Sequence, residues 1–231
     1  MAAKKIDHTE DKIEGIESAL SRTELYIEEN QKSLTVIVLA IAIIVIGFTL
    51  YKRYIVGPKE VEAQSQMYIA EEYFEKDSFN LALNGDGNNM GFLEIIDEYG
   101  ITRSANLANY YTGISYLHLG EYENAIDYLK DFDSKDQVVK SVATGAIGDA
   151  YLELDNEKDA LSMYLKAAKQ RKNEFTSPIY MMKAAQVYEG QEDYKKAIAL
   201  YEEVKKEYPE SNEAKDIDKY IARAEMLLSE N

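Results

Sequence analysis

The stretch GISYLHLGEYENAIDYL, residues 113–129, is the part of this 231-residue chain that decides its fold. Related stretches occur at residues 70–83, 148–164 and 184–201. Each contains a small residue, a tyrosine three positions later and an alanine nine positions after that tyrosine. Proline is nearly absent after Pro58 and glycine is sparse, so the pattern is helical throughout. The sequence therefore predicts a helical unit that occurs four times.

The alanines of the four stretches are separated by 43, 35 and 37 residues. A period of about 34 residues with small and aromatic residues at fixed offsets resembles the tetratricopeptide repeat (TPR), a pair of antiparallel helices. Small residues belong where two such helices cross, so we expect Gly113 and Gly148 there, with the repeat tyrosine filling the gap. Pro209 comes after the last stretch, as in the TPR consensus. The repeat tyrosines are Tyr73, Tyr116, Tyr151 and Tyr188, and the repeat alanines are Ala82, Ala125, Ala160 and Ala197.

The predicted fold is all-α, with a single transmembrane helix followed by a TPR-like α-solenoid of about four helix pairs plus a C-terminal capping helix. An unrelated helical bundle is the alternative. The first interval is long because of a glycine-rich insert at residues 84–91, which breaks the first repeat between Leu83 and Phe92. Residues 212–229 fit the terminal helix that a solenoid needs. Their apolar stripe contains Ala214, Ile217, Ile221, Ala224 and Leu228.

The segment LTVIVLAIAIIVIGFTLY, residues 34–51, has 18 residues without charge or proline. As a helix it spans roughly 27 Å, close to the thickness of a bilayer's hydrocarbon core. A cleaved signal peptide and a buried core helix are the alternatives, but a long acidic tail precedes the segment and no small-residue cleavage site comes after it. We therefore predict a partly helical acidic tail over residues 1–33, a transmembrane helix over 34–53 and a solenoid domain over 54–231.

The chain is strongly acidic, with 26 lysines and arginines, 42 aspartates and glutamates and a formal charge of −16. Residues 54–231 carry 19 of the basic and 34 of the acidic residues. Nucleic acid is therefore not an expected partner, because phosphate contacts need clustered lysine and arginine. Cysteine is absent, and His8 and His118 lie far apart in the sequence. No catalytic constellation is recognisable, so we expect neither enzymatic activity nor a cofactor.

One segment partly matches a calcium-binding loop. Positions one, three, six and twelve of that template are occupied by Asp86, Asn88, Gly91 and Asp97. Met90 stands at position five, where an oxygen ligand is needed, and position twelve lacks the usual glutamate. We therefore expect a structural turn and no metal site.

TPR domains bind peptides on the concave face that the first helices of the repeats form, and the resemblance implies such a site here. The groove is expected to be apolar and acidic, and to bind proteins or peptides with apolar or basic segments. The lysine–asparagine clamp that some TPR domains use for a C-terminal carboxylate is absent, since Asp149 stands where an amide would be needed. The alternative is that these side chains pack against neighbouring helices. The expected partner-binding residues are Tyr68, Glu71, Phe74, Tyr110, Ile114, Leu117, Asp149, Leu152, Met182, Gln186 and Glu189.

An acidic tail, one membrane span and a TPR domain in this order resemble the bacterial inner-membrane TPR proteins known as ancillary subunits of the Sec translocon. The resemblance is carried by SRTELYIEENQK at residues 21–32, by residues 62–82 and by GAIGDAYLELDNEKDAL at residues 145–161. It implies a cytoplasmic N-terminus and a periplasmic C-terminal domain that contacts exported chains or periplasmic chaperones beside the translocon. Lysine and arginine beside the span do not settle the orientation. The alternative is a scaffold subunit of another cell-envelope complex, for outer-membrane assembly or cell division.

Overall fold

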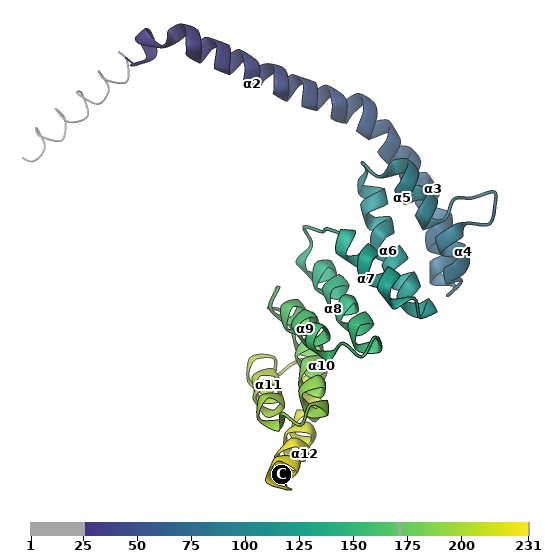
Figure 1. Cartoon of the computed structure of the whole chain (residues 1–231), viewed down its shortest axis with the longest axis vertical. Helices are drawn as coiled ribbons and strands as arrows, with labels where there is room; N and C mark the ends of the chain where they lie inside the picture. The colour runs from purple at the N-terminus through teal and green to yellow at the C-terminus, as the bar shows by residue number, and fades with distance from the viewer. Residues whose placement is uncertain (1–25, 171, 231) are drawn as a thin grey trace, which may run out of the picture. The chain divides into compact units, whose positions relative to one another are not determined.

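A computed structural model describes residues 26–170 and 172–230, which fall into two compact units divided between Gly57 and Pro58 (Figure 1). Most of the acidic tail predicted over residues 1–33 therefore lies outside the described residues. All regular elements within the described residues are helical, as the sequence predicts.

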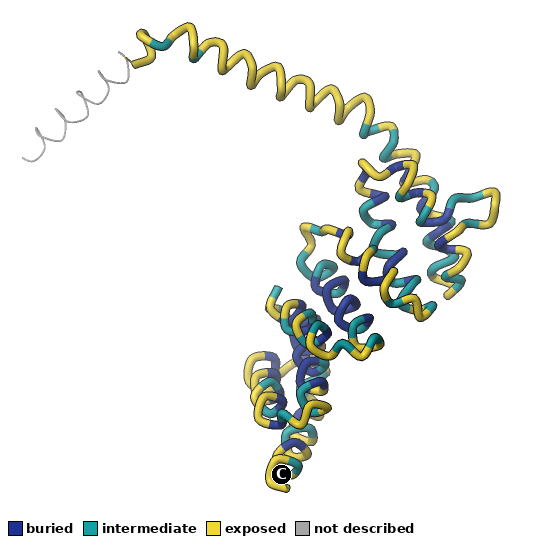
Figure 2. Tube along the Cα trace, viewed as in Figure 1, coloured by how far each residue is buried: buried dark blue, intermediate teal, exposed yellow. Residues whose placement is uncertain are grey.

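The first unit contains α2 (Gln31–Tyr51), which covers the apolar segment, and the π-helical turn η1 (Lys52–Val56). No α2 side chain is buried (Figure 2). The side chain of Ile43, for example, is 70% exposed. The hydroxyls of Thr35 and Thr49 donate to carbonyl oxygens four residues earlier, so these polar groups are satisfied within the helix. The helix is long and apolar enough to cross a membrane, and its exposure does not fit the core-helix alternative.

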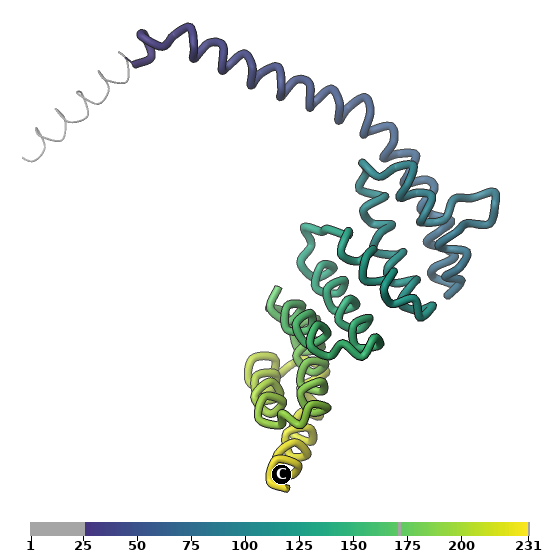
Figure 3. Tube along the Cα trace, viewed as in Figure 1, coloured from purple at the N-terminus to yellow at the C-terminus, as the bar shows by residue number. Residues whose placement is uncertain are grey.

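The second unit is a row of helix pairs with one last helix at its end, and from α4 onward each helix contacts the next one along the chain (Figures 1 and 3). This order confirms the predicted TPR-like solenoid of four helix pairs with a terminal helix. The pairs are α3 (Gly57–Glu75) with α4 (Phe79–Asn84) and α5 (Phe92–Tyr99), α6 (Arg103–Leu119) with α7 (Tyr122–Asp131), α8 (Gln137–Glu153) with α9 (Glu157–Gln170), and α10 (Thr176–Gly190) with α11 (Tyr194–Glu207), after which come the 3₁₀ turn η2 (Glu213–Asp216) and α12 (Ile217–Glu230).

The same turn joins the two helices of every pair. The residue five positions before the repeat alanine has a positive φ angle: Asp77 (56°), Gly120 (78°), Asp155 (56°) and Glu192 (58°). In all four turns the next backbone N–H donates to the carbonyl oxygen of the repeat tyrosine at 2.9 Å. This hydrogen bond belongs to a Schellman motif, which satisfies carbonyl groups at the end of a helix. The shared turn lies between the tyrosine and the alanine, and its constant length explains their fixed spacing.

Small residues lie where the helices of a pair cross, as predicted. A Cβ atom added to Gly113 would lie 2.5 Å from Cγ of Leu129, and one added to Gly148 would lie 2.7 Å from the ring of Tyr164. The prediction that the repeat tyrosine fills the gap is wrong, because the ring beside Gly148 belongs to Tyr164 rather than to Tyr151. Both contacting side chains lie four residues after the repeat alanine, on the buried side of the second helix.

The glycine-rich insert separates α4 from α5, as predicted. A Cβ atom added to Gly91 would lie 2.2 Å from the carbonyl oxygen of Leu83 and 2.4 Å from the backbone nitrogen of Gly85. Gly85 itself has a φ of 73°, a conformation that glycine adopts without strain. The insert therefore leaves the helix and returns at almost the same point. The side chain of Phe92 is fully buried beyond it, so α5 completes the second helix of the first repeat.

Asp86 organises the insert. Its carboxylate accepts hydrogen bonds from the backbone N–H groups of Asn88 (2.8 Å) and Asn89 (2.7 Å) and from the hydroxyl of Tyr73 (2.9 Å). Hydrogen bonds from the Asn89 side chain and from these backbone groups hold the pKa of Asp86 well below its ordinary value. Asp97 lies on α5 with an exposed side chain. Among the described residues no three acidic or histidine side chains lie close enough together to hold a metal ion.

The terminal helix α12 packs against α11. Ile217 and Ala224 are buried, and Ile221 is half-buried. Leu228 belongs to the same apolar stripe, but its side chain is 36% exposed, two residues before the end of the helix. The terminal helix therefore covers the last repeat over most of its length.

Candidate protein-interaction groove

The predicted partner-binding residues all lie on the first helices of the repeats: α3, α6, α8 and α10. Four of them, on α8 and α10, line the two pockets described below. The structure brings Asp149, Leu152, Met182 and Gln186 to two neighbouring pockets, which together form a candidate groove.

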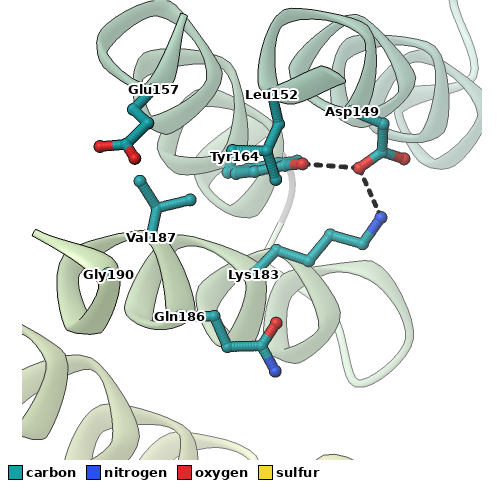
Figure 4. A pocket seen from close by; sticks show the side chains of 8 residues that line it. All are labelled: Asp149, Leu152, Glu157, Tyr164, Lys183, Gln186, Val187 and Gly190. Atoms are coloured by element: carbon teal, nitrogen blue, oxygen red, sulfur yellow. Dashed lines mark hydrogen bonds and ion pairs between the residues drawn. The ribbon is translucent and has the colours of Figure 1, made fainter. Parts of the chain in front are cut away.

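The first pocket has a volume of 320 Å³ and lies between α8, α9 and α10 (Figure 4). Of the predicted residues, Asp149, Leu152 and Gln186 line it. Leu152 is 40% exposed and supplies apolar surface at the opening. The lining residues that were not predicted from the sequence are Glu157, Tyr164, Lys183, Val187 and Gly190. Lys183 and Gly190 lie three residues before and four residues after Gln186, so helical periodicity places them on the same face of α10.

Asp149 carries the central charge of this pocket. Its Oδ1 atom accepts hydrogen bonds from the hydroxyl of Tyr164 at 2.7 Å and from Nζ of Lys183 at 2.6 Å (Figure 4). Burial, and after it the hydrogen bond to Asp149, raises the pKa of Tyr164, so its hydroxyl stays protonated and donates. The Lys183 ammonium group also lies over the rings of Tyr164 and Tyr180, at 5.6 and 6.0 Å. The groove is therefore less acidic here than the sequence suggested, because Lys183 neutralises Asp149.

The second pocket, also 320 Å³, lies between α10, η2 and α12. It shares Lys183 and Gln186 with the first pocket, so the two hollows adjoin one another along α10. Met182, which the sequence predicts to bind a partner, lines this pocket together with Ile179, which was not predicted and whose side chain is 39% exposed. The other lining residues are Asn212, Glu213, Asp216 and Tyr220. Its apolar wall thus faces two carboxylates of η2.

The other predicted residues line neither pocket. The ring of Phe74 packs edge-on against Tyr111, and that of Tyr110 packs against Phe132. Glu189 forms an ion pair with Arg223 of α12. Four of these residues pack against the hydrophobic core: Phe74, Tyr110, Ile114 and Leu117. The side chain of Glu71 is half-buried, and that of Tyr68 is exposed. For the four residues that pack against the core, the structure supports the alternative that their side chains contact neighbouring helices.

A family model described as tetratricopeptide repeat matches residues 107–135 and 180–211, which cover α7 and α11 with parts of α6 and α10. No curated protein sequence matches the chain. Among solved structures, the crystal structure of MamA protein is similar with a TM-score of 0.56 and 19% identity, over 73% of this chain and 85% of that one. Two further crystal structures show TPR-like repeats of a protein assigned as a kinesin light chain from Podosopora anserina, one of them with a single substitution. Their TM-scores are 0.54 and, for the substituted form, 0.55. Both are 13% identical to this chain, over 74% of this chain and 88% of those chains. The helical second unit of this chain is therefore a TPR-like α-solenoid, with two segments that match the tetratricopeptide-repeat model.

Proposed function

We propose that this protein is a membrane-anchored protein-interaction module whose partner binds the groove along α8, α10 and η2. The observation that carries the proposal is the pair of adjoining pockets, which present exposed apolar side chains beside acidic ones. TPR domains in general bind proteins or peptides, and α2 is long and apolar enough to tether such a domain to a membrane.

The lining residues define the chemistry of the partner. Leu152 and Val187 form an apolar wall in the first pocket, and Ile179 continues it in the second. Carboxylates of Glu157 and Glu213 lie at the two ends of the groove, while the central one is already paired with Lys183. A segment with apolar side chains flanked by basic residues fits this order, because no ion pair within the described residues involves Glu157 or Glu213.

The cellular context is proposed from the resemblance to the Sec-associated TPR proteins. The protein assists protein export or envelope folding next to the Sec translocon of a bacterial inner membrane, with the N-terminus cytoplasmic and the solenoid periplasmic. The competing role is that of a scaffold in another envelope complex, for outer-membrane assembly or cell division. Purification in mild detergent separates these roles: translocon subunits recovered with the full chain support the first, and their consistent absence supports the second. Protease added to spheroplasts tests the topology, since a protected solenoid would contradict it.

The groove itself is tested with a matched pair of substitutions. Leu152 in the groove and Leu81 on α4 are 40% and 42% exposed, so an arginine at either position disturbs the fold to a similar extent. Leu152→Arg should abolish recovery of the partner proteins, and Leu81→Arg should leave it unchanged. Equal recovery with both variants would contradict the proposed site.

A further inference from the structure

A third hollow lies between the second helices of two repeats. It has a volume of 410 Å³ and is bounded by α7, α8 and α9. Its floor is apolar, since the side chains of Leu129, Phe132 and Ile147 are buried there beside Ala143 and Met163. None of its lining residues is shared with the groove.

The rim of this hollow is basic, in a domain that is otherwise acidic. Lys130 of α7, Lys140 of α8 and Lys166 of α9 surround the opening, and Asp133 is the one acidic residue among those that line it. Residues 54–231 have 34 acidic and 19 basic residues, so three lysines around one opening reverse the local sign of the charge.

The three ammonium groups are held at separate points. Lys130 donates to the hydroxyl of Tyr151 at 3.1 Å, and Lys140 pairs with Asp133 at 2.6 Å. The Asp133 side chain is 79% exposed, so this pair is weak and another carboxylate can replace it. No hydrogen bond or ion pair within the described part of the chain occupies the ammonium group of Lys166.

We propose that this lysine-rimmed pocket binds an acidic segment of a partner protein, which places one bulky apolar side chain on the floor. Separate positive charges around an opening match several carboxylates along a peptide better than a single lipid head group. The acidic domain is also repelled by an anionic bilayer. This site is independent of the groove, whose proposed partner is basic.

The test uses the full chain in phosphatidylcholine nanodiscs and a fluorescein-labelled peptide, EELFEE, with binding measured by fluorescence anisotropy. Reversing the rim charge with Lys166→Glu should weaken binding by about tenfold, whereas Lys158→Glu, an exposed position on the same helix outside the pocket, should change it by less than about twofold. The peptide EEGGEE, which lacks the apolar anchor, should also bind about tenfold more weakly.

Three outcomes would overturn the proposal. Two of them are equal effects of Lys166→Glu and Lys158→Glu and undetectable binding of EELFEE at about 1 mM, where even weak complexes form. The third is displacement of the peptide by soluble dihexanoylphosphatidylglycerol, which would assign the pocket to an anionic lipid. Unchanged thermal melting of Lys166→Glu shows that a loss of binding is not a loss of fold.

Discussion

The first and third repeats share one turn but differ in the helix that comes after it. In the third repeat α9 is continuous, and Tyr164 lies four residues after the repeat alanine, against Gly148 and on Asp149. In the first repeat the same position is Asp86, which lies in the insert and accepts a hydrogen bond from Tyr73. The second helix of a repeat can therefore be interrupted by an insert, provided that the two ends of the insert lie close together and an aromatic ring still fills the core. The proposed groove belongs to the uninterrupted repeats.

The largest effect is expected at the tight crossing of the third repeat. Gly148→Leu should lower the free energy of unfolding by more than about 2 kcal/mol, because the added atoms meet the ring of Tyr164. Gly190→Ala is the control, since a Cβ atom there meets nothing within 4 Å. Thermal melting measured by circular dichroism should show a lower Tm for the first variant only. An unchanged Tm for Gly148→Leu would contradict the close crossing.

The insert of the first repeat should be sensitive at its closing point and less so at its tip. Gly91→Ala should cost about 2 kcal/mol, because its methyl group would meet the Leu83 carbonyl oxygen. Gly87→Ala should cost about 1 kcal/mol, from its positive φ of 85° alone, since the space around it is open. Urea unfolding of both variants gives the comparison, and the reverse order would mean that the ends of the insert are not pinched together.

The shared turn predicts a smaller effect with opposite signs. Gly120→Ala should destabilise the second repeat by about 1 kcal/mol, because alanine is strained at positive φ. Glu192→Gly should stabilise the fourth repeat by up to about 1 kcal/mol for the same reason. The Tm of Gly120→Ala should therefore lie below that of the wild type, and the Tm of Glu192→Gly should lie above it. Movement in the same direction would show that the two turns are not equivalent.

The two repeats should also respond to opposite ends of the pH scale, which is the smallest effect. Hydrogen bonds lower the pKa of Asp86 in the fold, so its contribution is present above its ordinary value of 3.8 and is lost as the pH falls below it. Burial raises the pKa of Tyr164, so its contribution is present below its ordinary value of 10.0 and is lost as the pH rises above it.

Each of these contributions can be removed by a nearly isosteric substitution. Asp86→Asn should flatten the acid side of a plot of Tm against pH, and Tyr164→Phe should flatten the alkaline side. Either variant flattening the opposite side would contradict the assignment of the two groups.

Much of the fold can be predicted from the sequence because repeat spacing is a local property. The turn fixes the distance from Tyr116 to Ala125, and a cluster of glycine and asparagine marks the insert. Contacts between helices were harder to predict. Nothing in the spacing shows that Tyr164 rather than Tyr151 faces Gly148, or that Gly145 receives the Tyr180 ring of the next repeat.

For the candidate groove, four of the eleven residues predicted from the sequence line the two pockets, and their role in binding stays a prediction. Asp149, Leu152 and Gln186 come together because helical periodicity places them on the first helices of adjacent repeats. The neutralisation of Asp149 by Lys183 joins two repeats, and the contribution of η2 depends on how the chain turns after α11. Both features depend on contacts between residues far apart in the sequence. Such contacts have no fixed spacing that a single sequence would reveal.

The most direct test of the account places a photo-crosslinking amino acid at Leu152 or at Leu81 of the full chain in living cells. The account predicts discrete protein adducts at position 152 that disappear when Val187 is replaced by arginine, and no such adducts at position 81. The same adducts at both positions, or adducts at 152 that survive Val187→Arg, would contradict the assignment of the groove along α8 and α10 as the partner-binding surface.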